Sequence, residues 1–364
     1  MVKHYIKTTF ILLLTGGWLL QNCTSSSEKE PVSAYMDTTA FRLEKYASIE
    51  PVRSEPSLRP EGWINYFFSR KDCRCLFDGE YFVSVQEAYP DSKNLMISLQ
   101  GGGASWPGLD ESKEEVNRDD IYVSEFTTEL ALRLDQEWNQ LVIPYCDGSI
   151  YMGDKAADYD EDGDVDHWHW GYRASSAGVA LAVKNFPELE NIFITGCSAG
   201  GYGTIVVARL IDYHYPDANI FVLNESGPGM FHHEDIETWN IIKQAWNLDP
   251  MLTRDCDDCD GELIYLYEDL LGRNQNLKIG LYSSYEDFVI AEEYLQMIPE
   301  NFRTLLVSSS GYLNKKYPDQ FKRFFIKGNS HCVEDRDYQI NGTTYWDWIC
   351  GILNDNEHWI DILE

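Results

Sequence analysis

Short apolar runs alternate with segments of helical periodicity along most of the chain, and this alternation limits the possible folds more than any other feature. The apolar runs are residues 95–99, 141–143, 192–195, 220–223, 278–282 and 324–326. The segments of helical period are residues 124–138, 174–186 and 203–213. Strands that alternate with helices of this length predict βαβ units, in which helices cover both faces of a mostly parallel sheet.

The length of the chain, 364 residues, suits one large α/β domain or two small ones. No stretch after about residue 40 has the composition of a flexible linker, and no internal repeat is present. Hydrophobic residues make up 44% of the chain, enough to build a core, which argues against disorder. We therefore expect a single α/β, doubly wound domain with inserted loops over residues 41–364.

The first 22 residues have the pattern of a signal peptide. Lys3 and Lys7 form a short positive region, and the apolar run over residues 10–20 is too short to span a membrane. Cys23 follows this segment in a position that resembles the lipidated cysteine of bacterial lipoproteins. We expect a lipidated Cys23 and a flexible tether over residues 23–40, with an ordinary cleaved secretory signal as the alternative. Either signal predicts export, to the bacterial cell envelope (outer membrane or periplasm) or to the medium.

The charge balance excludes several classes of partner. The chain has 29 Lys and Arg against 60 Asp and Glu, a formal net charge of −31. Nucleic-acid binding depends on cationic side chains that neutralise phosphates, so no nucleic-acid partner is expected. Docking on an anionic lipid surface through charge is excluded for the same reason. Contact with a membrane is therefore expected only through the N-terminal lipid anchor.

Nine cysteines are present, and eight remain when Cys23 is set aside. An even number of cysteines in an exported chain predicts disulfides, but the spacing does not reveal how they pair. Cys256 and Cys259 are close enough in sequence to pair with each other. We expect Cys197 to stay reduced, because its neighbours indicate a tightly packed turn.

The most informative motif is Gly196-Cys-Ser-Ala-Gly200, which lies between an apolar run and a segment of helical period. This is a G-x-S-x-G motif in the strand–turn–helix context of a nucleophile elbow. Such a turn exposes the hydroxyl of its serine, here Ser198, and aims the N-terminus of the next helix at a developing oxyanion. The sequence therefore predicts a serine nucleophile.

A glycine-rich segment, Gln100-Gly-Gly-Gly103, follows another apolar run. Backbone N–H groups in such a segment can face a substrate, as in the oxyanion loops of α/β-hydrolases. A plain flexible turn is the alternative.

A catalytic base and acid are expected after the serine, in the order Ser, Asp or Glu, His. His331 lies on a predicted loop just past the apolar run at residues 324–326, where a general base is required. Glu286 and Asp287 follow the run at residues 278–282, and either carboxylate could orient the imidazole.

Taken in order, these motifs resemble the pectin acetylesterase/Notum family of carboxylesterases, over about residues 60–350. The matching segments are Cys75-Leu-Phe-Asp-Gly79, Leu99-Gln-Gly-Gly-Gly103, Ile143-Pro-Tyr-Cys-Asp-Gly-Ser149, Tyr151-Met-Gly-Asp154, Gly196-Cys-Ser-Ala-Gly-Gly201, Asn224-Glu-Ser-Gly227 and His331-Cys332. The resemblance implies an α/β-hydrolase fold with Ser198 as nucleophile and His331 as base, and Asp287 fits the family's acid better than Glu286. It also implies oxyanion donors at Gly102, Gly103 and Ala199.

The chain departs from the family pattern at two places. Ala104-Ser-Trp106 stands where the family has Trp-Cys, so a family disulfide is expected to be missing, and Ile290 replaces a usual Gln. The family includes enzymes that remove acetyl from pectin and one that removes a fatty acyl group from a signalling protein. The resemblance therefore implies ester hydrolysis but leaves the acyl group open.

We expect a secreted, monomeric serine carboxylesterase that cleaves an acyl ester, acetyl or longer, from a glycan or other acylated substrate. Acyl transfer by a serine requires no cofactor. The alternative is a non-catalytic surface module on the same fold that binds glycan through its Trp and Tyr residues.

An acidic loop follows the segment that ends at Asp154. Its carboxylates alternate like the start of an EF-hand calcium loop, with Gly163 at position 6, although His169 replaces the usual Glu at position 12. So many like charges repel one another unless a cation or solvent relieves them. The predicted ligands of a structural Ca²⁺ are Asp158, Asp160, Asp162, Asp164 and Asp166, with a solvated loop as the alternative. Zinc bound by His167 and His169 is a further alternative.

Overall fold

A computed structural model describes residues 43–57, 62–116, 125–230, 235–249, 252 and 262–364. The predicted signal peptide, residues 1–22, and the predicted tether, residues 23–40, lie outside the described residues. So do Cys256 and Cys259. Among the described residues, no helix combines the length and the apolar character needed to cross a membrane.

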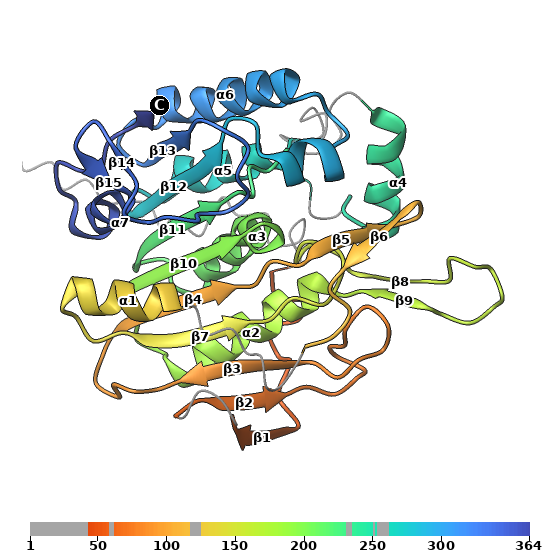
Figure 1. Ribbon diagram of the computed structural model, residues 1–364. Helices are drawn as coiled ribbons and strands as arrows, with labels where there is room; N and C mark the ends of the chain where they lie inside the picture. Colours follow the sequence, from red (N-terminus) through yellow and green to blue (C-terminus); the bar gives the residue numbers. More distant parts are fainter. Residues whose placement is uncertain (1–42, 58–61, 117–124, 231–234, 250–251, 253–261) are drawn as a thin grey trace, which may run out of the picture. The chain divides into compact units, whose positions relative to one another are not determined.

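A ten-stranded sheet forms the centre of the fold (Figure 1). In spatial order its strands are β1 (Arg53–Pro56), β2 (Ile64–Phe67), β3 (Phe82–Gln86), β7 (Asn139–Ile143), β4 (Asn94–Leu99), β10 (Asn191–Cys197), β11 (Asn219–Glu225), β12 (Leu277–Ser284), β13 (Phe321–Ile326) and β16 (Ile362–Leu363). All neighbours from β7 to β16 are parallel, whereas β1, β2 and β3 extend the sheet in antiparallel fashion. The predicted doubly wound, mostly parallel sheet is confirmed.

Helices pack on both faces of this sheet (Figure 1). One face carries α2 (Gly171–Asn185), α3 (Ala199–His214), α5 (Leu266–Arg273) and α6 (Pro299–Lys316), and the other carries α1 (Glu125–Leu134) and α7 (Tyr345–Asn354). The side chains of β10 show why both faces are covered. Ile192 and Ile194 belong to one apolar cluster and Phe193 to the other, and all three are fully buried. Because successive side chains of a strand point to opposite faces, a strand with apolar layers on both faces has a continuous apolar sequence, as predicted.

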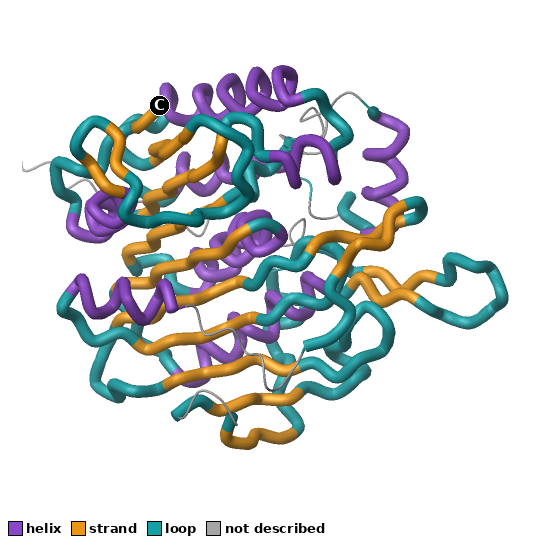
Figure 2. The backbone as a smooth tube through the Cα atoms, viewed as in Figure 1, coloured by secondary structure: helices purple, strands orange, loops and turns teal. Residues whose placement is uncertain are grey.

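Shorter elements lie outside the sheet (Figure 2). Three hairpins are formed by β5 (Gly103–Trp106) with β6 (Leu109–Ser112), β8 (Lys155–Ala157) with β9 (His167–His169), and β14 (Gln339–Ile340) with β15 (Thr343–Thr344). The remaining elements are helix α4 (Ile236–Trp246), a 3₁₀ turn (Leu263–Tyr265) and a π-helical turn (Val289–Tyr294). The first hairpin continues directly from the end of β4, so the glycine-rich segment after β4 is part of an ordered turn.

Two disulfides are present among the described residues. Cys75 is bonded to Cys146, and Cys197 is bonded to Cys332 with their Cα atoms 6.0 Å apart. The prediction that Cys197 stays reduced is therefore wrong. Its partner lies 135 residues away in sequence, on the loop after β13, and only the order of strands in the sheet brings the two cysteines together. Cys73 and Cys350 have no disulfide partner among the residues that the structure describes.

Candidate active site

Ser198 stands in the turn between β10 and α3, at the carboxyl edge of the parallel strands. Its backbone has φ 59° and ψ −127°, a strained left-handed conformation that suits a nucleophile elbow. The turn is possible because two neighbours lack side chains. A Cβ at Gly196 would lie 2.4 Å from the carbonyl oxygen of Gly200, and one at Gly200 would lie 2.2 Å from that of Leu99. Ser198 thus stands in the tight strand-to-helix turn that the motif predicts, and it is partly buried there.

His331 and Asp287 meet in the loops after β13 and β12. The Nδ1 atom of His331 lies 3.0 Å from both carboxylate oxygens of Asp287. Asp287 is fully buried, and its Oδ1 also accepts a hydrogen bond from the backbone N–H of Ile290 at 3.1 Å. Glu286 points elsewhere and pairs with Arg303 at 3.0 Å. Of the two carboxylates considered from sequence, Asp287 is the one in contact with the imidazole.

Ser198 and His331 are linked through their neighbours. Cys197 precedes the serine, Cys332 follows the histidine, and the two cysteines share a disulfide. A ring nitrogen of His331 lies within 4.8 Å of both sulfur atoms. Within the described part of the chain, no hydrogen bond joins Ser198 to His331 directly. Catalytic hydrogen bonds are often long in the absence of substrate and shorten when the substrate binds.

The three predicted oxyanion donors, Gly102, Gly103 and Ala199, differ in how the structure places them relative to Ser198. Gly103 and Ala199 line the same small cavity as Ser198. The carbonyl of Gly102 accepts a hydrogen bond from the backbone N–H of Lys113 at 2.7 Å, which fixes the glycine segment against β6. Gly101, which belongs to the predicted glycine segment but was not named as a donor, also lies close, since a Cβ there would be 3.1 Å from the Cβ of Ser198. The N-terminus of α3 also points toward this region, which favours a developing negative charge.

Comparison with known proteins gives a match to one family. Residues 136–253 match the family model described as Pectinacetylesterase. This match supports the predicted resemblance to the pectin acetylesterase family and the predicted hydrolysis of carboxylic esters. The segment matched to the pectinacetylesterases contains Ser198 and Ala199 but ends before Asp287 and His331, so the placement of those two residues depends on geometry alone.

A solved structure supports the same fold. The Wnt deacylase Notum from Drosophila aligns with a TM-score of 0.54, covering 82% of this chain and 95% of the Notum chain at 12% identity. At that identity the likeness shows the fold alone. No curated protein sequence matches the chain at a significant level.

A small apolar cavity opens beside Ser198. Its volume is about 30 Å³, and its walls include Trp106, Ile150, Ile290 and Leu295. All four side chains are nearly fully buried, so the walls are part of the packed core. A water-sized group needs roughly 10–15 Å³ of such volume, so the cavity accommodates only about two or three such groups.

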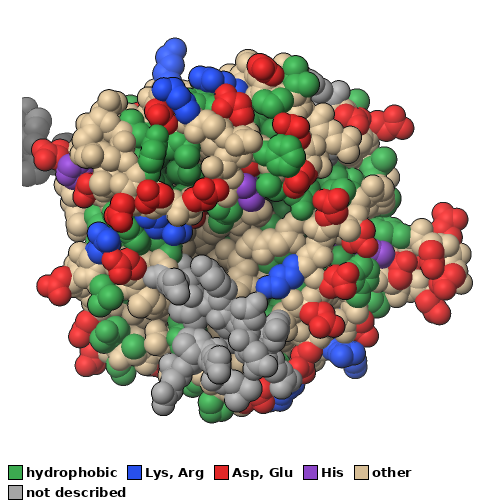
Figure 3. Space-filling view, in the orientation of Figure 1, with side chains coloured by type: hydrophobic (Ala, Val, Ile, Leu, Met, Phe, Trp, Pro, Cys, Tyr) green, Lys and Arg blue, Asp and Glu red, His purple; other side chains and the backbone are tan. Residues whose placement is uncertain are grey.

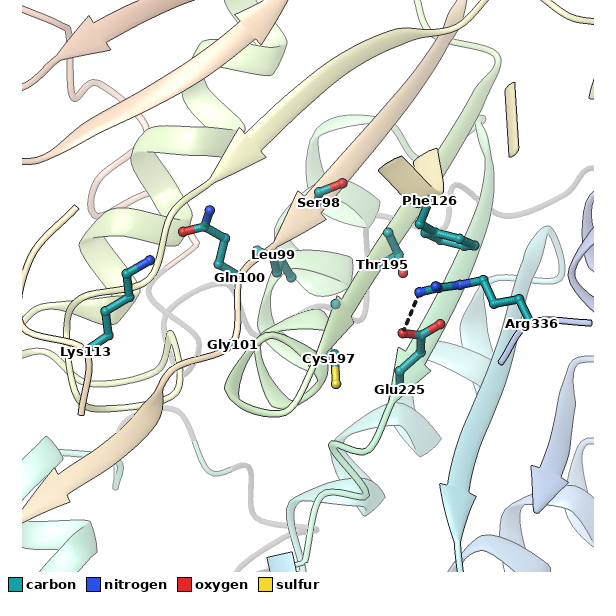
Figure 4. Close-up of a pocket in the computed structure, with 11 residues that line it drawn as sticks. Ser98, Leu99, Gln100, Gly101, Lys113, Phe126, Thr195, Cys197, Glu225 and Arg336 are labelled. Carbon is teal, nitrogen blue, oxygen red and sulfur yellow. Dashed lines mark ion pairs between the residues drawn. The ribbon is translucent and has the colours of Figure 1, made fainter. Parts of the chain in front are cut away.

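A larger and more polar cavity has a volume of about 340 Å³, and its lining includes Thr195 and Cys197 of β10 (Figure 4). Gly101 and Cys197 line it close to Ser198. Gln100 and Lys113 lie at one side of the pocket and Arg336 at the other, where it forms an ion pair with Glu225 at 3.7 Å (Figure 4). Burial raises the pKa of Glu225, and the Arg336 charge and the Tyr345 hydroxyl oppose that rise.

Two polar atoms in this larger cavity have no hydrogen-bond partner among the described residues. They are Oε1 of Gln100 and Nε of Arg336, and both atoms are buried. Buried polar groups without a partner are uncommon in folded proteins and indicate a place for water or a ligand. The face in Figure 3 is hollowed near its centre, and Lys or Arg side chains border the hollow although Asp and Glu are widespread around it.

The acidic loop forms the tip of the β8–β9 hairpin, where Asp and Glu side chains gather (Figure 3). Carboxylate oxygens of Asp158, Asp160 and Asp166 lie within 4.8 Å of one another. Oδ1 of Asp158 is buried and has no hydrogen-bond partner among the described residues, so this oxygen is available to a cation. The carboxylates of Asp162 and Asp164 are not part of this group. The structure therefore brings together three of the five predicted ligands.

The histidines after this loop have other partners. His169 is buried, its Nε2 lies 2.7 Å from the Tyr159 hydroxyl, and its Nδ1 lies 3.2 Å from the carbonyl oxygen of Asp147. Burial lowers the pKa of His169 to about 3, so the ring is neutral. His167 is hydrogen bonded to Asp166 at 2.8 Å. Both ring nitrogens of His169 are occupied, which argues against the zinc alternative and against His169 as the last ligand of the loop.

Several residues of the site were not predicted. The walls of the small cavity come from β5, α3, the turn after β7 and the segment after β12. Lys113 follows β6, and Arg336 lies on the loop after β13. Gly103, Ala199, Trp106 and Ile290 stand at positions named from the sequence, but no motif contains Lys113, Arg336, Tyr294 or Leu295, which reach the site only through tertiary packing.

Proposed function

We propose that the chain is an exported serine esterase that removes short acyl groups, acetyl above all, from hydroxyl groups of a glycan. The observation that carries this proposal is the meeting at one edge of the sheet of Ser198, on a strained elbow, with the hydrogen-bonded pair of His331 and Asp287. The match of residues 136–253 to the Pectinacetylesterase family model supports the reaction type.

In the first half of the reaction, Nε2 of His331 accepts the proton of Ser198 as Oγ attacks the ester carbonyl. Asp287 keeps the proton on Nδ1 of His331, which leaves Nε2 free to act as the base. The resulting oxyanion lies against backbone N–H groups at the start of α3 and in the glycine segment, each contributing about 3 kcal/mol of transition-state stabilisation. His331 then protonates the leaving alcohol, and the acyl group remains on Ser198.

In the second half, His331 accepts a proton from a water molecule that attacks the acyl-enzyme. The same oxyanion donors stabilise the second tetrahedral intermediate. Collapse of this intermediate releases the carboxylic acid and returns the proton to Ser198. The chemistry is complete with these side chains and water, and no cofactor takes part in it.

The small cavity lined by Ser198 and the larger cavity lined by its neighbour Cys197 support separate sites for the two parts of an ester substrate, the acyl group and the alcohol. The apolar cavity of about 30 Å³ suits the methyl group of an acetyl ester and is too small for a long acyl chain. The polar cavity of about 340 Å³ suits a hydroxyl-rich alcohol such as a sugar. Lys113 and Arg336 in this cavity favour a sugar that carries a carboxylate close to the acetylated hydroxyl.

Export and calcium binding complete the proposal. The signal-like residues 1–22 and Cys23 support a lipid-anchored protein of the cell envelope or a secreted one. The carboxylates at the tip of the β8–β9 hairpin support a structural Ca²⁺ that would bind Asp158, Asp160 and Asp166, remote from the chemical step.

Hydrolysis of acetylated substrates tests the enzymatic proposal. Wild type should release acetate from an acetylated oligosaccharide and from 4-nitrophenyl acetate, whereas Ser198→Ala should not exceed the uncatalysed background. Cys350→Ser, a change of similar size on α7, is the control and should retain activity. If wild type also shows no turnover but binds the deacetylated oligosaccharide, the alternative of a glycan-binding module replaces the enzyme.

A further inference from the structure

The loop that carries His331 has little regular structure of its own. It runs from the end of β13 at Ile326 to the start of β14 at Gln339. Its first part is fixed to the loop after β12 by backbone hydrogen bonds, from Glu286 to Gly328 at 3.0 Å and from Phe288 to Asn329 at 3.1 Å. These bonds hold the loop next to Asp287, but they do not connect it to the strand that carries Ser198.

The connection to the nucleophile strand lies on the other side of His331. Cys332 is bonded to Cys197, the last residue of β10. The backbone N–H of Cys332 also donates to Oγ of the buried Ser226, at the end of β11, at 3.0 Å. Cys332 has φ 63°, a conformation that a residue with a side chain adopts only when its surroundings enforce it.

We propose that the Cys197–Cys332 disulfide is a thiol-sensitive positioning element that holds His331 within reach of Ser198. The inference rests on the proposed roles of those two residues. One covalent bond joins the residue before the nucleophile to the residue after the base, so the relative position of the two functional groups depends on it. A displacement of about 1 Å between reacting groups can lower a rate by about a hundredfold.

The two disulfides differ in their exposure to a reductant. Cys75 and Cys146 are 0% and 1% exposed, whereas Cys197 and Cys332 are only partly buried. Dithiothreitol should therefore open the bond at the active site first. In this step the Sγ–Sγ bond gains two electrons and two protons to give two thiols, and dithiothreitol closes to its cyclic disulfide. Opening the bond releases His331 from the nucleophile strand and slows the esterase.

The first test is the double variant Cys197→Ser/Cys332→Ser, assayed with 4-nitrophenyl acetate below its unfolding midpoint. We expect kcat to fall at least about tenfold while KM changes less than about twofold. Cys350→Ser, which removes an unpaired thiol, is the matched control and should behave as wild type. A double variant with the kcat of wild type would overturn the inference.

A second test separates positioning from general stability. If the disulfide acts through His331, its loss should have no further effect in a His331→Ala background, where the base is already missing. A fall in kcat of the same size in both backgrounds would show that the disulfide acts through the fold in general, and would contradict the proposed role.

Reduction of wild type keeps the inference testable even if the double variant does not fold. After mild dithiothreitol treatment and alkylation, mass spectrometry should find labels on Cys197 and Cys332 but not on Cys75 and Cys146. The loss of kcat should follow the labelling of the first pair, and reoxidation before alkylation should restore it. Full activity with both active-site cysteines labelled would overturn the inference. If wild type is inactive before reduction and Ser198→Ala changes nothing, the proposed function itself has failed.

Discussion

Ser198 can adopt its strained turn because Gly196 and Gly200 lack side chains, and the imidazole of His331 is oriented by its hydrogen bonds to the buried Asp287. Glu286 is adjacent in sequence, yet its carboxylate pairs with the exposed Arg303. At the scale of single residues, the difference between a catalytic acid and a surface charge is therefore the direction in which two consecutive side chains point.

This difference predicts opposite outcomes for two similar substitutions. Asp287→Asn should lower kcat by about 10⁴-fold, because the amide cannot hold the histidine tautomer that leaves Nε2 free. Glu286→Gln should change kcat by less than about twofold, because an exposed ion pair contributes little. Steady-state kinetics on 4-nitrophenyl acetate measures both. Equal losses in the two variants would contradict the assignment of the acid.

The size of the acyl group depends on the side chains that close the small cavity. Leu295→Ala removes one buried wall, so the ratio of kcat/KM for hexanoyl over acetyl esters should rise at least about tenfold. Leu306→Ala, a truncation of a buried leucine in α6 outside the cavity, is the control for lost packing. It should leave that ratio unchanged, and a parallel rise in both variants would show that the cavity does not select the acyl group.

At the scale of elements, the parallel strands bring the site together because their carboxyl ends lie at one edge of the sheet. The turn after β10 holds Ser198, and the loops after β12 and β13 hold Asp287 and His331. The hairpin of β8 and β9 is an addition to this arrangement, with its acidic tip away from the sheet (Figure 1). Its charges repel one another unless a cation is bound, so its stability should depend on calcium.

Removal of calcium should therefore destabilise the protein. A chelator should lower the unfolding midpoint of wild type by about 5 °C, since saturating ligand contributes a few kcal/mol to stability. In Asp158→Asn/Asp160→Asn the chelator should have no effect, whereas Asp217→Asn, an exposed change elsewhere, should respond as wild type does. Differential scanning calorimetry makes the comparison. An unchanged midpoint in wild type would argue for a solvated loop.

The sequence predicted those elements whose pattern of apolar residues or motif lies within one short stretch of the chain. The apolar runs became β4, β7, β10, β11, β12 and β13, and the elbow motif lies between a strand and a helix as its spacing requires. The antiparallel strands β1 and β2 were missed because they are short and partly exposed, without a continuous apolar run. The partner of Cys197 and the walls of the cavities were missed because they depend on contacts between distant segments.

At the scale of the whole molecule, the formal charge of −31 is spread mostly over the surface, but several carboxylates are buried, and Asp147 is one of them. Asp147 follows β7, and its Oδ1 accepts hydrogen bonds from the backbone N–H and the hydroxyl of Ser149, at 2.8 Å and 2.5 Å. Burial raises the pKa of Asp147 to about 6, although these hydrogen bonds oppose the rise. The folded state therefore binds this proton more tightly than the unfolded state, whose pKa is close to the usual value of 3.8.

The sign of the pH dependence follows from that difference. The contribution of Asp147 to stability is greatest below about pH 4 and falls as the pH rises to about 6, by roughly 3 kcal/mol. The side chain of the Asp147→Asn variant stays neutral at every pH. The difference between the free energies of unfolding of the variant and of wild type (variant minus wild type) should therefore increase from pH 4 to pH 7. Denaturation by urea at both pH values measures this change, with the exposed Asp91→Asn as control. A constant difference would show that Asp147 does not carry the proton.

Covalent labelling of the nucleophile tests the central claim most directly. A fluorophosphonate reacts only with a serine whose hydroxyl is activated by a nearby base, so intact mass spectrometry should show one adduct per wild-type chain and peptide mapping should place it on Ser198. His331→Ala should slow the labelling by several orders of magnitude, because the serine then lacks its base. A wild-type chain that remains unlabelled, or one labelled equally fast without His331, would contradict the account of this site as a serine esterase.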